Sequence, residues 1–478
     1  MRKGHDLLCR KVIVQSRQTL FFSHRFCSFG FCCRYLISSL PSLQESTMDK
    51  DIIPLTATTT LERIRHVRQN KMIQKVLDKD TSIMVEDPLE NEMVLNMGPQ
   101  HPATHGVLRV LLKVDGETVV KCVPELGYLH RGFEKLAENM NYHEFIPHTD
   151  RLDYIAPMSN NVAVTMAFEK LANVEVPERG QWVRMMVCEL ARLSSHLLAM
   201  GCTAMDVGAL TVFIWTFAER EKLYDLFEEI CGARFTTSYS RIGGVANDPH
   251  PELLKTIRQW LNEFPAKLKQ SEGLVMKNRI FIDRMAGVGY LPKEKAIALG
   301  VTGPCLRASG VEYDLRRLKP YMQYDKVDFD VITDTDGDSW ARFKVRGAEM
   351  WESVKILHQV IDKLETLKGP VLANNPKHVA PRKAEIYTRM EELINDFMLV
   401  NYGTMPPKGE AYASIENSKG ELGFYVVSDG SGQPWKCKIK SPSTTNLQAL
   451  PYMAEGSMIS DVVAIIGSID PVMGEADK

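Results

Sequence analysis

The sequence predicts an α+β fold in which a large helical core carries small antiparallel sheets built from both ends of the chain. Three patterns predict it: alternating apolar residues at 108–124, helical periodicity from about 132 to 400, and short alternating segments at 409–440. Side chains alternate with a period of two along a strand and 3.6 along a helix, so these patterns separate the two kinds of element. The 478 residues suffice for one large domain or two ordinary ones, and no internal repeat is found.

The first sheet is predicted from a hairpin. Apolar residues recur at every second position from Leu108 to Val114, and the chain returns over 118–123. Between them, Asp115-Gly116 is a strong two-residue turn signal.

The helical middle and the second sheet follow from the same reasoning. Trp182, Met186 and Leu190 begin a helical repeat. The predicted helices cover 182–197, 210–229, 345–367 and 387–400, with a linker at 370–381; the predicted strands cover 411–415, 422–428 and 435–440, and a short apolar run lies at 462–466.

Composition excludes several classes of protein. The formal net charge of -2 gives no electrostatic case for nucleic acid, and no uncharged apolar run is long enough for a membrane helix. No CxxC pair occurs among the ten cysteines, which argues against a structural zinc or an iron–sulfur cluster held by this chain. No metal ligand is therefore assigned.

The N-terminal residues differ from the rest. Residues 1–47 contain seven Lys/Arg and only two acidic residues, a composition that fits a transit peptide or an upstream stretch before a true start at Met48. Residues 48–93 are polar and patternless, which suggests an arm over a partner. The domain proper is predicted to cover 94–478.

A stiff loop at 98–106 carries the first candidate site. It contains two prolines and a terminal glycine, which restrict the backbone, and two histidines, His101 and His105, which titrate near neutral pH. The alternative interpretation is that both histidines cap local backbone groups.

Motifs in a fixed order connect the chain with a known family. They are Gly98–Arg109, Gly127–Gly132, Asp150–Tyr154, Met205–Leu210, Gly420–Gly423 and the C-terminal run Asp461–Asp477. In these motifs the chain resembles the quinone-site subunit of respiratory complex I, the proton-pumping NADH–quinone oxidoreductase. This is the D subunit of the bacterial complex, or the 49-kDa-type subunit of the mitochondrial one. The resemblance covers about 94–478.

That family is similar to the large subunits of nickel–iron hydrogenases, which implies a hydrogenase-like fold. Hydrogenases hold their metal with thiolates of two motifs, which here read Arg151–Ala156 and Asp470–Glu475. The four thiolate positions are Asp153, Ala156, Val472 and Glu475. Because soft thiolates select such a metal, hydrogenase activity is not expected.

The resemblance implies a set of catalytic residues. A quinone has two carbonyl oxygens, and its reduction takes two electrons and two protons, so the site needs a hydrogen-bond donor at each end. The family places Tyr154 and His105 on the head group and Asp206 against His105, where a carboxylate fixes the imidazole tautomer and stabilises the imidazolium. His101 is expected to support the loop. The structural alternatives are a core tyrosine at Tyr154 and a helix N-cap at Asp206.

The resemblance also implies partners and an electron source. Electrons pass from NADH through FMN and iron–sulfur clusters, the last of them in a small neighbouring subunit, with Arg131 and Arg151 near that cluster. Many relatives have a histidine where this chain has Thr236; threonine cannot couple the cluster's potential to pH, which favours menaquinone over ubiquinone as the substrate. Other peripheral-arm and membrane-arm subunits complete the implied complex.

Two alternative functions and two locations remain open at this point. The chain could serve a related complex that takes electrons from ferredoxin or another donor, or it could be a non-catalytic scaffold. The expected location is the cytoplasmic side of a bacterial inner membrane. If residues 1–47 are a transit peptide, it is the matrix side of the mitochondrial inner membrane.

Overall fold

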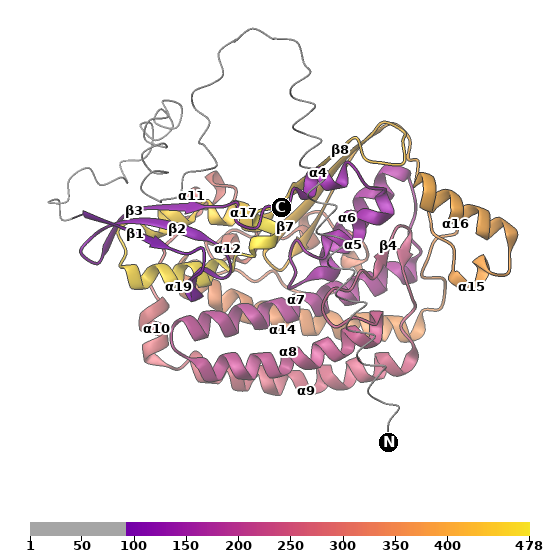
Figure 1. Cartoon of the computed structure of the whole chain (residues 1–478). Helices are drawn as coiled ribbons and strands as arrows, with labels where there is room; N and C mark the ends of the chain where they lie inside the picture. Colours follow the sequence, from indigo (N-terminus) through magenta and orange to yellow (C-terminus); the bar gives the residue numbers. More distant parts are fainter. Residues whose placement is uncertain (1–91) are drawn as a thin grey trace, which may run out of the picture. The chain divides into compact units, whose positions relative to one another are not determined.

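The computed structural model describes residues 92–478 (Figure 1). The predicted extension at 1–47 and the predicted arm at 48–93, except for its last two residues, lie outside the described residues. Within 92–478, helices dominate and two three-stranded antiparallel sheets flank them, together with a two-stranded ribbon. The predicted α+β class is confirmed.

The N-terminal sheet contains the predicted hairpin and one further strand. Its strands are β1 (Glu92–Met97), β2 (Arg109–Asp115) and β3 (Thr118–Glu125), in the order β1-β2-β3. Asp115 pairs with Thr118 across the predicted turn. Val110, Leu112 and Val114 are fully buried on one face, as their alternation predicted. Strand β1 was not predicted, because the sequence before residue 94 lacks the alternation that marks a strand.

Long helices form the core. They are α6 (Pro157–Ala172), α7 (Glu178–Asp206), α8 (Leu210–Cys231), α9 (Pro251–Val275) and α14 (Ser339–Thr366). Figure 1 shows α7, α8, α9 and α14 running alongside one another, and α7 contacts α6, α8 and α14. Helix α7 is therefore buried on nearly all sides, whereas α8 ends at Gly232, whose left-handed backbone (φ 81°) closes it.

The other helices between the two sheets are shorter. They are η1 (Pro102–Thr104), α4 (Phe133–Ala137), α5 (Tyr142–Thr149), α10 (Arg279–Met285), α11 (Lys293–Ala298), α12 (Pro304–Arg307), α13 (Leu315–Leu318), η2 (Tyr324–Lys326), α15 (Lys383–Ile386) and α16 (Met390–Tyr402), and the ribbon is β4 (Ser240–Arg241) with β5 (Gly244–Val245). The helix predicted at 387–400 begins at Met390 because Arg389 is extended.

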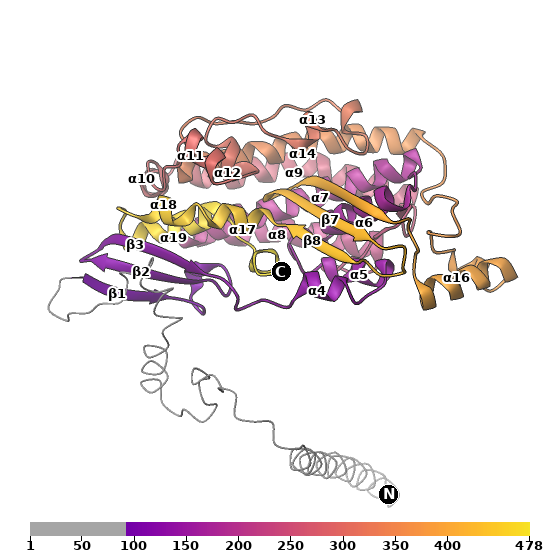
Figure 2. The same cartoon turned by 90° about the horizontal axis from the view of Figure 1, so that it is seen from above.

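The C-terminal part returns to the core. Strands β6 (Gly409–Asn417), β7 (Gly420–Ser428) and β8 (Lys436–Lys440) form the second predicted sheet, in that order (Figure 2). The helices α17 (Pro442–Leu447), α18 (Leu450–Ala454), α19 (Ile459–Ile469) and α20 (Met473–Ala476) follow. The apolar run at 462–466 lies inside α19, which packs against α7, α14 and η1.

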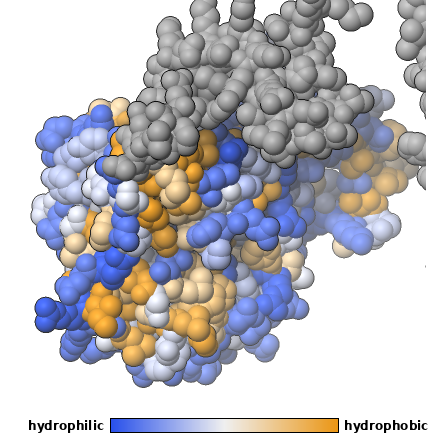
Figure 3. All heavy atoms as spheres, turned by 60° about the vertical axis from the view of Figure 1, so that its left-hand side comes forward, coloured by the Kyte–Doolittle hydropathy of each residue, from blue (hydrophilic) through white to orange (hydrophobic). Residues whose placement is uncertain are grey.

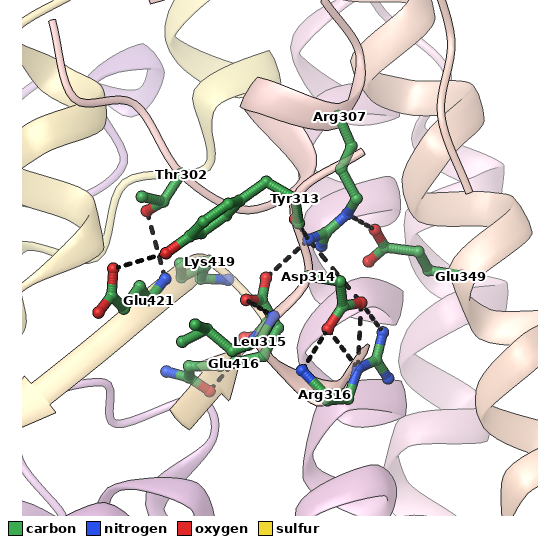
Figure 4. A network of polar contacts seen from close by, with 12 residues as sticks. Thr302, Arg307, Tyr313, Asp314, Leu315, Arg316, Glu349, Glu416, Lys419 and Glu421 are labelled. Atoms are coloured by element: carbon green, nitrogen blue, oxygen red, sulfur yellow. Dashed lines mark hydrogen bonds and ion pairs between the residues drawn. The ribbon is translucent and has the colours of Figure 1, made fainter. Parts of the chain in front are cut away.

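A cluster of buried charges joins α12, α14 and β6 (Figure 4). Arg307 donates from Nε to Glu349 at 2.8 Å and from Nη1 to Glu416 at 2.7 Å, and all three side chains are almost fully buried. Burial opposes ionisation of Glu349, but Arg307 and His196 outweigh it and hold the pKa of Glu349 below its usual range. Arg307 thus neutralises two carboxylates that come from distant parts of the chain.

Replacing Arg307 should therefore destabilise the fold strongly. Arg307→Met leaves Glu349 and Glu416 buried without this cation, and we expect the free energy of unfolding to fall by about 3–5 kcal/mol. Urea unfolding of the purified chain measures it. In the double variant Arg307→Met/Glu416→Gln the loss should be smaller than the sum of the two single losses; strict additivity would contradict the charge-pairing argument.

Candidate functional site

His105 and Asp206 are in direct contact although they lie 101 residues apart. The His105 Nε2 atom is 2.6 Å from Asp206 Oδ2, and both side chains are largely buried. Asp206 is the last residue of α7, and α8 is capped by Ala209, so Asp206 is not the helix N-cap that the sequence left open. With Nε2 facing the carboxylate, Nδ1 is the ring nitrogen left for another partner.

The loop that carries His105 has a fixed backbone. His101 is the N-cap of η1, and its Nδ1 accepts a hydrogen bond from Ala103 N at 3.2 Å. His105 ends η1 in the left-handed region (φ 49°), where residues other than glycine are uncommon. The two histidines therefore differ: His101 caps the backbone, and His105 faces Asp206.

Tyr154 lies in the turn between α5 and α6. Its ring centroid is 6.5 Å from that of Phe235, and no described residue accepts a hydrogen bond from its hydroxyl. Burial, followed by the carboxylates of Asp153 and Asp470, raises the pKa of Tyr154, while Arg131 opposes the shift. The phenol is thus kept protonated, which suits a proton donor.

The residues 467–477, called here the C-terminal segment, lie against both donors. A Cβ at Gly467 would stand 2.8 Å from Asp206 Oδ2 and 3.7 Å from His105 Nε2. A Cβ at Gly474 would stand 2.6 Å from the carbonyl oxygen of Leu152 and 3.1 Å from the Tyr154 ring. Small residues at these two positions allow one short segment to contact both parts of the site.

The same segment also holds a third motif. Asp477 accepts hydrogen bonds from the backbone nitrogens of Gly127 at 2.8 Å and Leu129 at 2.7 Å, and its own carbonyl oxygen is 2.6 Å from His130 Nδ1. His130 is therefore a structural histidine.

The three remaining predicted residues lie around Tyr154. Arg131 donates from Nη2 to the Arg151 carbonyl oxygen at 2.7 Å, and both arginines are exposed. Burial and the charge of Arg151 lower the pKa of Arg131. Thr236 is half-buried in the loop after α8, next to Phe235, whose ring lies near Tyr154. These positions leave the two guanidinium groups free to face a partner.

The residues at the former thiolate positions do not fit a nickel–iron centre. Asp153 and Glu475 are hard ligands, while Ala156 and Val472 supply none. The ammonium of Lys419 is buried beside Asp470, where it would repel a metal cation. Among residues 92–478 no cluster of His, Cys, Asp and Glu is arranged to hold a metal ion.

An apolar surface adjoins the site. Leu210, Ile214 and Trp215, on the first turns of α8, are 54%, 57% and 42% exposed. Figure 3, in which the left-hand side of Figure 1 comes forward, shows apolar side chains gathered on that face. Across the described part of the chain, no helix has the length and apolar character needed to cross a bilayer.

Comparison with known proteins gives the family. The model of the respiratory-chain NADH dehydrogenase 49-kDa subunit matches residues 206–478. The first of two NADH-quinone oxidoreductase D subunits of Chloroherpeton thalassium is 56% identical over 435 residues, 89% of this chain and 98% of the relative. The corresponding D subunit of Salinibacter ruber is 56% identical over 393 residues, 82% and 87% of the two chains.

The chain belongs to the 49-kDa subunit family.

This membership confirms the family predicted from the ordered motifs and the hydrogenase-like fold that goes with it, and it makes the chain a subunit of an oxidoreductase. Within the family framework, the sequence analysis missed four residues at the site: Gly467, Gly474, Asn417 and Lys419. Glycines in the C-terminal run were the available signal for the first two. The turn that carries Asn417 and Lys419 was visible, but not what it contacts.

The buried Glu475 predicts how stability depends on pH. Burial, with a further contribution from Asp153, raises the pKa of Glu475 from 4.5 to about 8. The folded chain therefore holds a proton that the unfolded chain releases, so stability falls as the pH rises from about 4.5 to 8. Each pH unit in this window costs up to about 1.4 kcal/mol.

Glu475→Gln mimics the protonated acid and should remove this dependence. We expect its free energy of unfolding to rise relative to the unchanged chain between pH 5 and pH 8, as measured by urea unfolding at each pH. Glu312→Gln, at an exposed glutamate, is the matched control. Parallel stability curves for Glu475→Gln and the unchanged chain would refute a protonated Glu475.

Proposed function

We propose that this chain forms the quinone-reduction site of a proton-pumping NADH–quinone oxidoreductase, complex I, together with a neighbouring iron–sulfur subunit. The family supports a role at the quinone. The observation that carries the proposal is the His105–Asp206 contact, because it couples a proton donor to a buried carboxylate at 2.6 Å. Relatives named for NADH and quinone favour this function over a ferredoxin-fed complex.

In the proposed reaction, two side chains deliver the two protons. Tyr154 donates from its hydroxyl to one quinone carbonyl. His105 donates to the other from Nδ1, as the imidazolium that Asp206 stabilises through Nε2. After transfer, His105 is the neutral tautomer with its proton on Nε2, still bound to Asp206. Both donors are then reprotonated, and the two electrons come from the partner's cluster.

We infer that His101 supports the loop and that Arg131 and Arg151 face the partner's cluster, where positive charge would stabilise its reduced form. Other peripheral-arm and membrane-arm subunits of the complex would surround the chain, and the apolar surface on α8 would lie within that assembly. The chain would sit on the cytoplasmic side of a bacterial inner membrane, as the bacterial relatives suggest. Mass spectrometry of the mature N-terminus would distinguish this from mitochondrial import.

Tyr154→Phe tests the donor. The substitution deletes one hydroxyl with little change in packing, and losing a preorganised donor typically costs on the order of 100-fold in rate. We expect NADH:quinone reductase activity in membranes to fall by about that factor, while NADH oxidation by an artificial acceptor persists.

Tyr142→Phe is the matched control, because it also removes a buried hydroxyl, one that has no hydrogen-bond partner among the described residues. It should leave both activities intact. If Tyr154→Phe is equally inert, Tyr154 is a packing residue and its assignment to the quinone fails.

Thr236 predicts the behaviour of the partner's cluster. Threonine carries no titratable proton near neutral pH, so we expect a cluster of low potential that varies little with pH, which suits menaquinone. Thr236→His should add a dependence approaching about 59 mV per pH unit, the limit for one proton per electron. Redox titration of the complex at several pH values measures both. A steep pH dependence in the unchanged complex would contradict the menaquinone preference.

A further inference from the structure

The turn between β6 and β7 brings a buried lysine to the C-terminal segment. Lys419 Nζ contacts the Asp470 carboxylate and donates to Ser195 Oγ at 2.8 Å. In the same turn, Asn417 donates from Nδ2 to Asp153 Oδ2 at 2.9 Å. One turn therefore holds two carboxylates from different segments: Asp470, which ends α19, and Asp153, which precedes Tyr154.

The charge of Lys419 reaches further than its contact. It also interacts electrostatically with the carboxyl groups of Asp153 and Glu475, which are both fully buried. Arg220 on α8 is a second cation that acts on Asp153. Because a buried carboxylate is costly unless it is paired, the ammonium stabilises a group of acids that would otherwise repel one another.

The turn itself is held firmly. Arg192 donates to the carbonyl oxygens of Glu416 at 2.5 Å and Asn417 at 3.2 Å, and Asn446 donates from Nδ2 to the Lys419 carbonyl oxygen at 3.1 Å. A Cβ at Gly303 would stand 2.5 Å from that same oxygen. Figure 4 shows Lys419 in the turn close to Glu416 of the Arg307 cluster. The lysine is thus presented by a rigid support.

We propose that Lys419 is a positioning residue of the quinone site: its ammonium joins the C-terminal segment to the turn that carries Tyr154. Hydrogenases connect the same two motifs through a metal, which the residues of this chain do not fit. The Lys419 bridge takes over that mechanical role. The catalytic consequence rests on the proposed function, whereas the bridge is a property of the fold.

The bridge has a kinetic consequence because its two ends lie under different donors. Gly474 packs on Tyr154 and Gly467 on the His105–Asp206 pair, so a shift of the C-terminal segment displaces both. A displacement of about 1 Å in a reacting group can cost on the order of 100-fold in rate.

The test uses Lys419→Met in the assembled complex, with two readouts. Hydrogen–deuterium exchange measures backbone protection over 151–156 and 467–476. Steady-state kinetics measures kcat and KM for quinone, with artificial-acceptor activity reporting assembly. We expect faster exchange in both segments and a kcat at least about tenfold lower, with the artificial-acceptor activity retained.

Two further variants serve as references. Lys419→Arg keeps the cation and should retain most of the protection and the turnover. Lys438→Met breaks an exposed ion pair with Glu134 on the same sheet and should change neither readout. If Lys419→Met does not assemble, Lys419→Met/Asp470→Asn removes the uncompensated carboxylate and is measured in the same way.

Each outcome decides the proposal. Unchanged exchange in either segment overturns the bridge. Faster exchange with unchanged kcat overturns the positioning role, as does a loss of both activities in proportion. If Tyr154→Phe leaves quinone reduction intact, the proposed function of Tyr154 fails, while the exchange experiment still decides the bridge.

Discussion

The pairing of buried charges is the constraint on which this structure depends. Glu189, in the middle of α7, accepts hydrogen bonds from Tyr324 at 2.7 Å and Ser353 at 2.8 Å and pairs with Arg316. Arg192, one turn further, binds backbone carbonyl oxygens of the β6–β7 turn. An ion left unpaired in such an interior costs several kcal/mol. The helices, the linking segments and the turn can therefore dock in the one arrangement in which every carboxylate meets a cation or a donor.

The site is a consequence of that docking. Once the turn and α19 are fixed, the C-terminal segment passes beneath three motifs that are far apart in sequence: Gly127–Gly132, the turn at Tyr154 and the end of α7. Each is held by a different device, namely backbone hydrogen bonds to Asp477, the close approach of Gly474 and the close approach of Gly467. The last residues of the chain thus act as a common support, and a shift of this segment would be felt at both proton donors.

The chemistry of the family has changed on a retained scaffold. The two motifs that hold a metal in hydrogenases still meet here, but carboxylates and an ammonium have replaced the thiolates. Ion pairs of this kind hold chain segments together and raise the pKa of Tyr154, yet they carry no electrons. In the proposed function, the redox centre is therefore the partner's cluster, and this chain contributes proton donors and their positions.

The sequence by itself determined the hairpin, the long helices, the second sheet and the family, because each rests on a pattern within a short stretch or on motifs in a fixed order. The ordered motifs also pointed to His105 and Asp206 as a pair. Tertiary structure alone decided that His101 caps a turn while His105 faces the carboxylate, that β1 joins the first sheet, and that Lys419 reaches Asp470. The physical reason is that a contact between residues tens or hundreds of positions apart depends on how helices pack and leaves no periodic signal along the chain.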